Sequence, residues 1–316
     1  MAYKFEADES VRGAILRCSR EQLDEAVFEL SEGTSTDPVS AVHEARKAIK
    51  KQRSLLRLAR GAMPSGQRRR ENAALRGAAR RISGVRDADV LIATIGQLSE
   101  RFAGQLPAHA FESIRSYFDA RRSAQNGNGG GSVLDGRAVR ELAAVRARMD
   151  DWDLRAGGWK ALEPGLLRAY GRGRAAFARV GVGGEMEDLH AWRKRVKDLW
   201  YHERLLAPTC GPTMAGHAKE LDRLSDLLGD DHDLALLRQE LTADSTPVAV
   251  DLGAVVGLID YRHTELQSEA IHIGDRVYAE TPKAFRRRMG EYWNAGRALA
   301  RAPHEEHPAQ LAAATR

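Results

Sequence analysis

The sequence carries the octapeptide HEARKAIK at His43–Lys50, and the octapeptide HAWRKRVK at His190–Lys197 repeats its charged positions. Both read H-x-x-R-K-x-x-K. Positions i, i+3, i+4 and i+7 lie on one face of an α-helix, so each copy aligns an imidazole, a guanidinium and two ammonium groups along one stripe. The repeat therefore predicts two helices that each present a basic face to a negatively charged ligand.

The basic stripe continues past each octapeptide and stays free of carboxylates. At 100° per residue, it occupies an arc of roughly 100°, and neither arc contains Asp or Glu. An ordinary solvated face, the main alternative, mixes signs and uses Glu–Lys pairs, whereas like charges at these spacings repel. The pattern favours an anion site, whose candidate ligands are His43, Arg46, Lys47, Lys50, Arg57, His190, Arg193, Lys194, Lys197, Tyr201 and Arg204.

Composition bounds the class of protein. The chain has 316 residues, 43% of them hydrophobic, and a formal net charge of +5, which indicates a local basic site and not a uniformly cationic surface. Two distant cysteines give no disulfide framework. The N-terminus has no apolar signal core, and no uninterrupted run of about 18 apolar residues occurs. We expect a soluble cytoplasmic protein without a membrane partner.

Nearly the whole chain has a helical pattern, because Ala, Leu, Arg and Glu dominate and alternating β-branched runs are absent. The prediction is an all-α fold. The Gly-rich segment 126–132 is expected to be a connector, and 303–316 a disordered tail. The expected helices span 9–32, 38–61, 65–83, 87–103, 108–124, 135–152, 159–180, 186–206, 212–228, 231–243, 248–273 and 281–301.

A second pair of similar segments follows the two octapeptides. Residues 82–89 and 228–235 share an outline of a small residue, a turn, a basic residue, Asp and an apolar helix. Two related helical halves, about 1–125 and 133–302, account for this repeat. The run Asp230–Asp233 could hold a metal ion, but acidic residues also suit a helix N-terminal turn, which we favour.

Neither a metal, a cofactor nor a catalytic nucleophile is expected. Lys and Arg neighbours would repel a cation from His43 and His190, and no nucleophile signature occurs. Beside a polyanion these histidines would be held more protonated and would add donors. Other basic side chains rank below the two stripes, namely Arg53, Arg76, Arg80, Arg81, Arg86, Arg168 and Arg172, with Arg68–Arg70 and Arg286–Arg288 favoured as solubilising surface.

Together these motifs resemble the conserved histidine α-helical domain family, known as CHAD. The two octapeptides, the latter extended to Tyr201, resemble its signature helices, and the segments 83–87 and 228–233 resemble its second recurring element, although Ser83 stands where the second half has Gly229. The resemblance covers roughly residues 9 to 301. It implies one domain over 1–302, built of two pseudo-symmetric helical bundles around a basic central channel that binds inorganic polyphosphate.

The leading hypothesis is a non-catalytic polyphosphate-binding protein that targets or scaffolds polyphosphate granules. RNA or DNA binding is the alternative, although aromatic residues for base stacking are few and no nucleic-acid motif is present. A third hypothesis is a polyphosphate-processing phosphohydrolase or kinase, for which the sequence offers no Walker-type loop. Equal-charge competition between polyphosphate and nucleic acid separates the first two hypotheses, and Mg²⁺-dependent phosphate release or transfer identifies the third.

Overall fold

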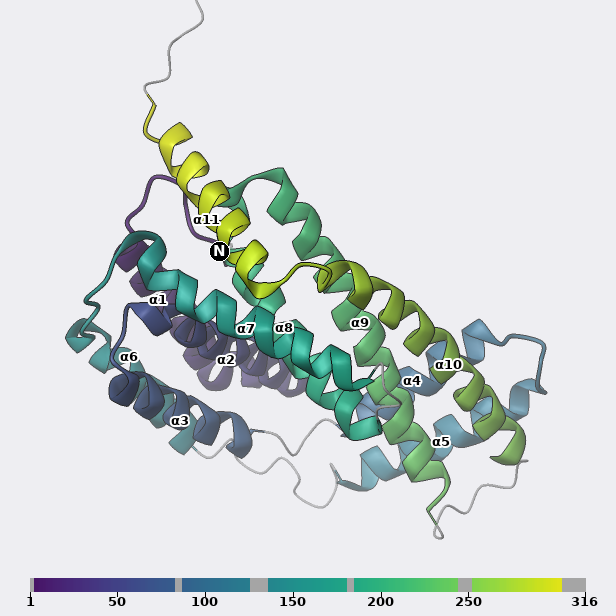
Figure 1. Ribbon diagram of the computed structural model, residues 1–316. Helices are drawn as coiled ribbons and strands as arrows, with labels where there is room; N and C mark the ends of the chain where they lie inside the picture. The colour runs from purple at the N-terminus through teal and green to yellow at the C-terminus, as the bar shows by residue number, and fades with distance from the viewer. Residues whose placement is uncertain (1–2, 83–86, 126–135, 181–184, 244–251, 303–316) are drawn as a thin grey trace, which may run out of the picture.

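A computed structural model describes residues 3–82, 87–125, 136–180, 185–243 and 252–302. Over these residues the fold is all-α, with eleven α-helices and no strand (Figure 1). The 3-10 turn η2, Ala59–Gly61, follows the second helix directly. The helices are α1 Val11–Ser31, α2 Pro38–Leu58, α3 Ser65–Arg81, α4 Asp87–Arg101, α5 Ala108–Gln125, α6 Arg137–Ala147, α7 Gly158–Val180, α8 Met186–Cys210, α9 Pro212–Leu241, α10 Leu252–Val277 and α11 Pro282–Leu299.

Local sequence signals fix where several helices begin. The Asp37 carboxylate accepts hydrogen bonds from the backbone N–H groups of Val39 and Ser40, and Pro38 occupies the first turn of α2. Proline costs nothing there because its missing N–H would have no partner within the helix. This start of α2 confirms the expectation from the sequence, and it sets the phase of the first basic stripe.

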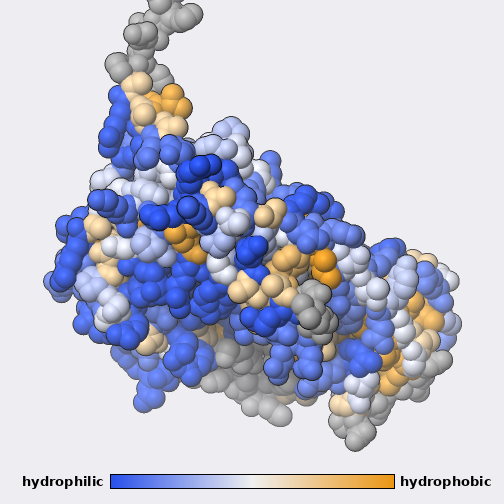
Figure 2. Space-filling view, in the orientation of Figure 1, coloured by the Kyte–Doolittle hydropathy of each residue, from blue (hydrophilic) through white to orange (hydrophobic). Residues whose placement is uncertain are grey.

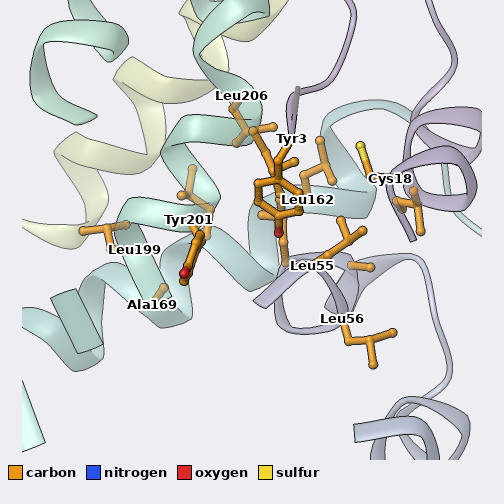
Figure 3. Close-up of a cluster of buried hydrophobic side chains, with 14 of the residues drawn as sticks. Tyr3, Cys18, Leu55, Leu56, Leu162, Ala169, Leu199, Tyr201 and Leu206 are labelled. Carbon is orange, nitrogen blue, oxygen red and sulfur yellow. The ribbon is translucent and has the colours of Figure 1, made fainter. Parts of the chain in front are cut away.

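The larger hydrophobic core contains side chains from the N-terminal segment and from α1, α2, α3, α6, α7 and α8. Parts of α9, α10 and α11 also contribute to it. Figure 3 shows Tyr3, from the N-terminal segment, among side chains of α2, α7 and α8. The Tyr3 hydroxyl donates to the carbonyl of Lys51 at 2.7 Å, and the Phe5 N–H donates to the carbonyl of Leu205 at 2.9 Å. The Tyr3 side chain thus ties this segment to α2, and the Phe5 backbone ties it to α8.

A smaller hydrophobic core lies at the other end of the molecule. Leu91 and Phe118, from α4 and α5, pack with Leu237 of α9 and Ile259 of α10. In Figure 1, α4 and α5 lie beside the lower ends of α9 and α10, away from α1, α3 and α6. Both α9, which is 30 residues long, and α10 contribute side chains to the two cores, so these two helices join them.

These two cores do not coincide with the halves 1–125 and 133–302 expected from the sequence. α6 follows the connector yet packs on α1 and α3, whereas α4 and α5 precede it and pack with α9 and α10. Pseudo-symmetry of the halves stays a prediction. The connector 126–132 and the tail 303–316 lie outside the described residues.

The expected break in the second half, between helices 212–228 and 231–243, is wrong. α9 continues through Gly229 without interruption. Asp231 is buried and accepts hydrogen bonds from His263 Nδ1 at 2.7 Å and Gln267 Nε2 at 2.8 Å, both on α10. The aspartate therefore fastens α9 to α10 instead of capping a new helix. The corresponding first-half segment, 83–86, lies outside the described residues.

The surface in Figure 2 is largely hydrophilic, with apolar side chains scattered over it. Within the described part of the chain, no helix combines the length and the apolar character needed to cross a membrane.

Candidate anion-binding cavity

Both basic stripes line one cavity of ≈ 740 Å³. From α2 it takes Arg46, Lys50 and Arg57. From α8 it takes five of the six candidates. The cavity thus brings together residues that lie far apart in sequence. The α8 members are His190, Arg193, Lys194, Lys197 and Tyr201.

Close helix packing holds the two stripes in place. A Cβ atom added to Gly165 of α7 would lie 2.2 Å from the carbonyl oxygen of Leu58, so only glycine permits this approach of α7 to α2. α2 is also joined to α8, because His202 Nε2 donates to the Ser54 carbonyl at 3.0 Å. The cavity walls are therefore set by backbone contacts between packed helices.

Further side chains from α2 and others from α3, α7 and η2 complete the basic lining. Arg53 of α2 and Arg168 and Arg172 of α7, all secondary candidates, line the cavity as well. Of the described residues that line it, thirteen are Lys or Arg and one is a carboxylate, Asp198. Sequence reasoning missed several of these positions, or favoured solubilising surface for them. They are Arg60, Arg68, Arg69, Asn72, Arg195 and Asp198.

The remaining candidates among the described residues do not line this cavity. Lys47 pairs with Glu44 at 2.9 Å, and the Arg204 guanidinium lies over the Trp200 ring at 5.5 Å. Arg81 pairs with Glu141 at 3.1 Å. Arg86 lies outside the described residues. Three more candidates, also absent from the cavity lining, are His43, Arg76 and Arg80.

Positive charge is concentrated in the cavity, and Asp198, the carboxylate among the described lining residues, does not balance it. Burial, with Arg57 beside it, lowers the pKa of Arg53 to about 10. Burial also lowers the pKa of Lys197, helped by the nearby Arg193. The pKa values of Arg60 and Arg68 are lowered by burial and by neighbouring arginines, Arg168 among them. A bound anion would relieve this repulsion.

Asp198 is the one exception among the described lining residues. Its Oδ1 lies 2.7 Å from Nη2 of Arg57, and its Oδ2 lies 3.3 Å from Nη1 of Arg195. On a helical wheel Asp198 stands about 80° from His190, just beyond the acid-free arc. The arc of the α8 stripe is free of carboxylates, as its sequence predicts, but the cavity is not.

The histidines of the cavity are neutral at pH 7 in the free protein. Burial lowers the pKa of His190 to about 4, helped by Lys194, and its Nδ1 has no hydrogen-bond partner among the described residues. The His190 ring lies 4.6 Å from the ring of His232 on α9, centroid to centroid. Burial also lowers the pKa of His202 to about 4. The expected protonation of His190 beside a polyanion stays a prediction about the complex.

A second hollow of ≈ 690 Å³ adjoins the basic cavity and shares four side chains with it. The shared residues are Arg172, His190, Lys194 and Arg195. The rest of its lining is mixed and includes Met186, Leu236, Arg179 and Glu187. Over the described residues, no group of three or more His, Cys, Asp or Glu side chains is arranged to hold a metal ion.

Comparison with known proteins identifies the family. The CHAD domain model matches residues 17–242, well over half of the chain. The chain belongs to the CHAD domain family. The resemblance inferred from the two octapeptides is thereby confirmed, together with the all-α fold.

Two solved structures resemble this CHAD protein over most of its length. The CHAD domain from the plant Ricinus communis is 16% identical, with a TM-score of 0.53, covering 94% of this chain and 95% of its own. PptA from Streptomyces chartreusis is 13% identical, with a TM-score of 0.54, covering 86% and 98%. At these identities the likeness shows the fold alone. No curated protein sequence matches the chain.

Proposed function

We propose that this CHAD protein binds inorganic polyphosphate in the basic cavity, without catalysis. The observation that carries the proposal is the lining itself: among the described residues, thirteen Lys and Arg side chains accompany a single carboxylate. Polyphosphate binding is a general property of CHAD domains, and the chain belongs to that family. The cavity offers the donors that such a ligand needs.

The donor types suit a chain of phosphates. Guanidinium groups grip phosphate oxygens in bidentate fashion, while ammonium groups act as movable point charges. The ligand carries roughly one negative charge per unit, so many moderate contacts would add up to high affinity with strong salt dependence. The adjoining hollow, which shares Arg172, Lys194 and Arg195, gives a longer ligand a basic route out of the cavity.

Nucleic acid fits the same lining less well. Single-stranded nucleic acid is held by base stacking on aromatic platforms in addition to phosphate contacts. Among the Phe, Trp and Tyr side chains of the described residues, only Tyr201 lines the cavity, and it is buried. The lining thus offers phosphate donors without a surface for bases, which favours a polymer of phosphate alone.

The absence of catalysis is part of the proposal, and one feature of the lining supports it. Both oxygens of Asp198 are held by Arg57 and Arg195, so this carboxylate is not free to activate a water molecule. We further propose that the protein targets or scaffolds polyphosphate granules. Co-localisation of a tagged protein with these granules in cells tests this role. A purified protein that releases phosphate from polyphosphate with Mg²⁺ would contradict the non-catalytic assignment.

Competition binding tests the choice of ligand. Long-chain polyphosphate is bound to the protein at physiological salt, and duplex DNA or RNA is added at equal charge. We expect the nucleic acid to leave polyphosphate bound; displacement by nucleic acid would overturn the proposal.

A double variant tests the use of both stripes. Arg46→Ala with Arg193→Ala removes one guanidinium from each helix, both lining the cavity. Polyphosphate affinity should fall by tenfold or more, because a hydrogen bond to a charged group is worth about 1.5–3 kcal/mol. The helical circular dichroism spectrum should stay unchanged. Unaltered affinity would show that the two stripes do not form one site.

A further inference from the structure

We propose that Asp198 is an intramolecular competitor of the anionic ligand, and that it sets the affinity of the cavity. The inference rests on the proposed function, since it concerns the same site. The position of Asp198 is unexpected for a residue of a basic lining. A carboxylate lies in the wall of an anion cavity, where it would repel the ligand.

The geometry commits two guanidinium groups to this carboxylate. Arg57 reaches Asp198 from α2 at 2.7 Å, and Arg195 reaches it from one turn earlier on α8 at 3.3 Å. Side-chain exposure is 12% for Asp198 and 32% for Arg57, so the pair is largely shielded from water. Ion pairs of this kind are screened by salt much less than exposed ones. In the free protein both arginines thus share the single negative charge of Asp198.

A phosphate can gain these two arginines only by displacing Asp198. Displacement leaves a buried carboxylate without its partners, which is costly. If Asp198 stays paired instead, a phosphate nearby meets a like charge, and the remaining lining must hold the ligand. In either case Asp198 weakens binding. Removing the charge of Asp198 should make the guanidinium groups of Arg57 and Arg195 available to the ligand and should remove the repulsion between Asp198 and phosphate.

The test replaces Asp198 by Asn in the full chain and measures binding of long-chain polyphosphate over a range of salt concentrations. Asp198→Asn keeps the shape and removes the charge. We expect affinity to rise about tenfold, the worth of a charge-assisted hydrogen bond. We also expect a steeper salt dependence, with the slope of log affinity against log salt larger by about 0.7 for one added ion pair.

A matched control separates the local effect from net charge. Asp260 pairs with Arg238 at 2.8 Å on the exposed surface of α10 and α9 and lines neither hollow. Asp260→Asn makes the same change in net charge, so it should leave both affinity and slope nearly unchanged. An equal gain in the two variants would overturn the inference, because it would reduce the effect of Asp198 to overall charge.

A second variant guards against a folding defect, since Asp198→Asn leaves the half-buried Arg57 without its carboxylate partner. The double variant Arg57→Gln with Asp198→Asn replaces the pair by two neutral groups of similar shape, which is usually well tolerated. It should bind polyphosphate at least as tightly as the natural protein, although one arginine is gone. Arg172→Gln, which removes a cavity arginine outside the pair, should weaken binding. Equal weakening in both variants would refute the competitor role.

The outcome is distinguishable from failure of the proposed function. If the natural protein does not bind polyphosphate, the function itself is wrong. If it binds and Arg193→Ala weakens binding, while Asp198→Asn changes neither affinity nor slope, only the role of Asp198 fails. Thermal unfolding of each variant confirms that the measured protein is folded.

Discussion

Gly165 of α7 lies against the carbonyl oxygen of Leu58 at the end of α2, so closely that a Cβ atom would be 2.2 Å from that oxygen. The opposing atom is backbone and cannot rotate away. Because Arg168 and Arg172 follow on the same helix, this contact places the α7 arginines beside those of α2. The spacing between α2 and α7, which form walls of the cavity, thus depends on glycine at position 165.

Gly165→Ala should therefore destabilise the protein. A methyl group would force α2 and α7 apart, and such overpacking costs about 1–3 kcal/mol in the free energy of unfolding. Denaturant unfolding measures this change. Gly171→Ala is the matched control, because no atom lies within 4 Å of its Cβ position and alanine favours the helix by up to about 1 kcal/mol. Equal effects of the two substitutions would contradict the close-packing explanation.

Two lysines one turn apart on α2 should differ in their effect on binding. Lys50 lines the cavity, whereas Lys47 pairs with Glu44 outside it. Lys50→Ala should weaken polyphosphate binding several-fold and reduce the salt slope, because one phosphate contact is lost. Lys47→Ala should leave both nearly unchanged. Titration calorimetry of the two variants checks the difference, and a larger loss for Lys47→Ala would place the ligand elsewhere on α2.

His190 should take up a proton when polyphosphate binds. Its pKa is about 4 in the free protein, because burial and Lys194 disfavour the charged form. A phosphate beside it favours the charged form and raises the pKa. Affinity should therefore increase as the pH falls through the raised pKa toward 4, and level off below. Calorimetry in buffers of different ionisation enthalpy measures the uptake, which His190→Gln should reduce.

His202 should make the free protein less stable in acid. Burial lowers its pKa from 6.5 to about 4, so between these values the unfolded chain binds a proton that the folded chain does not. The free energy of unfolding then falls as the pH falls from about 6.5 to about 4, by up to about 3 kcal/mol. His202→Gln removes this contribution. An unchanged pH dependence of unfolding in that variant would contradict the neutral buried state.

The sequence predicted the helices well because their signals are local. The start of α2 at Pro38 follows from Asp37 and proline, which cap and initiate a helix wherever the chain goes afterwards. The break near Gly229 was predicted from equally local signals and is wrong. There the decisive contacts of Asp231 are with His263 and Gln267 on α10, which no local pattern reveals.

The candidate site was predicted only where one helix face carries it. Five of the six α8 candidates line the cavity, because residues at helical spacing lie on one face of the helix and therefore face the same side. Arg195 stands about 140° from His190 on the wheel, yet it lines the cavity too, where it pairs with Asp198. Arg68 and Arg69 line the cavity because tertiary packing places α3 beside it. Periodicity within one helix cannot show such neighbours.

The burial of Tyr3 and Phe5 against α8 also bears on how the chain is made. Synthesis delivers residues from the N-terminus at about 5–20 per second, and early segments often fold first. Here the Phe5 N–H donates to the carbonyl of Leu205, so this bond cannot form until some two hundred residues after Phe5 have been added. Tyr3 can meet Lys51 of α2 much earlier, but the contact of Phe5 with α8 forms only after α8 has been synthesised.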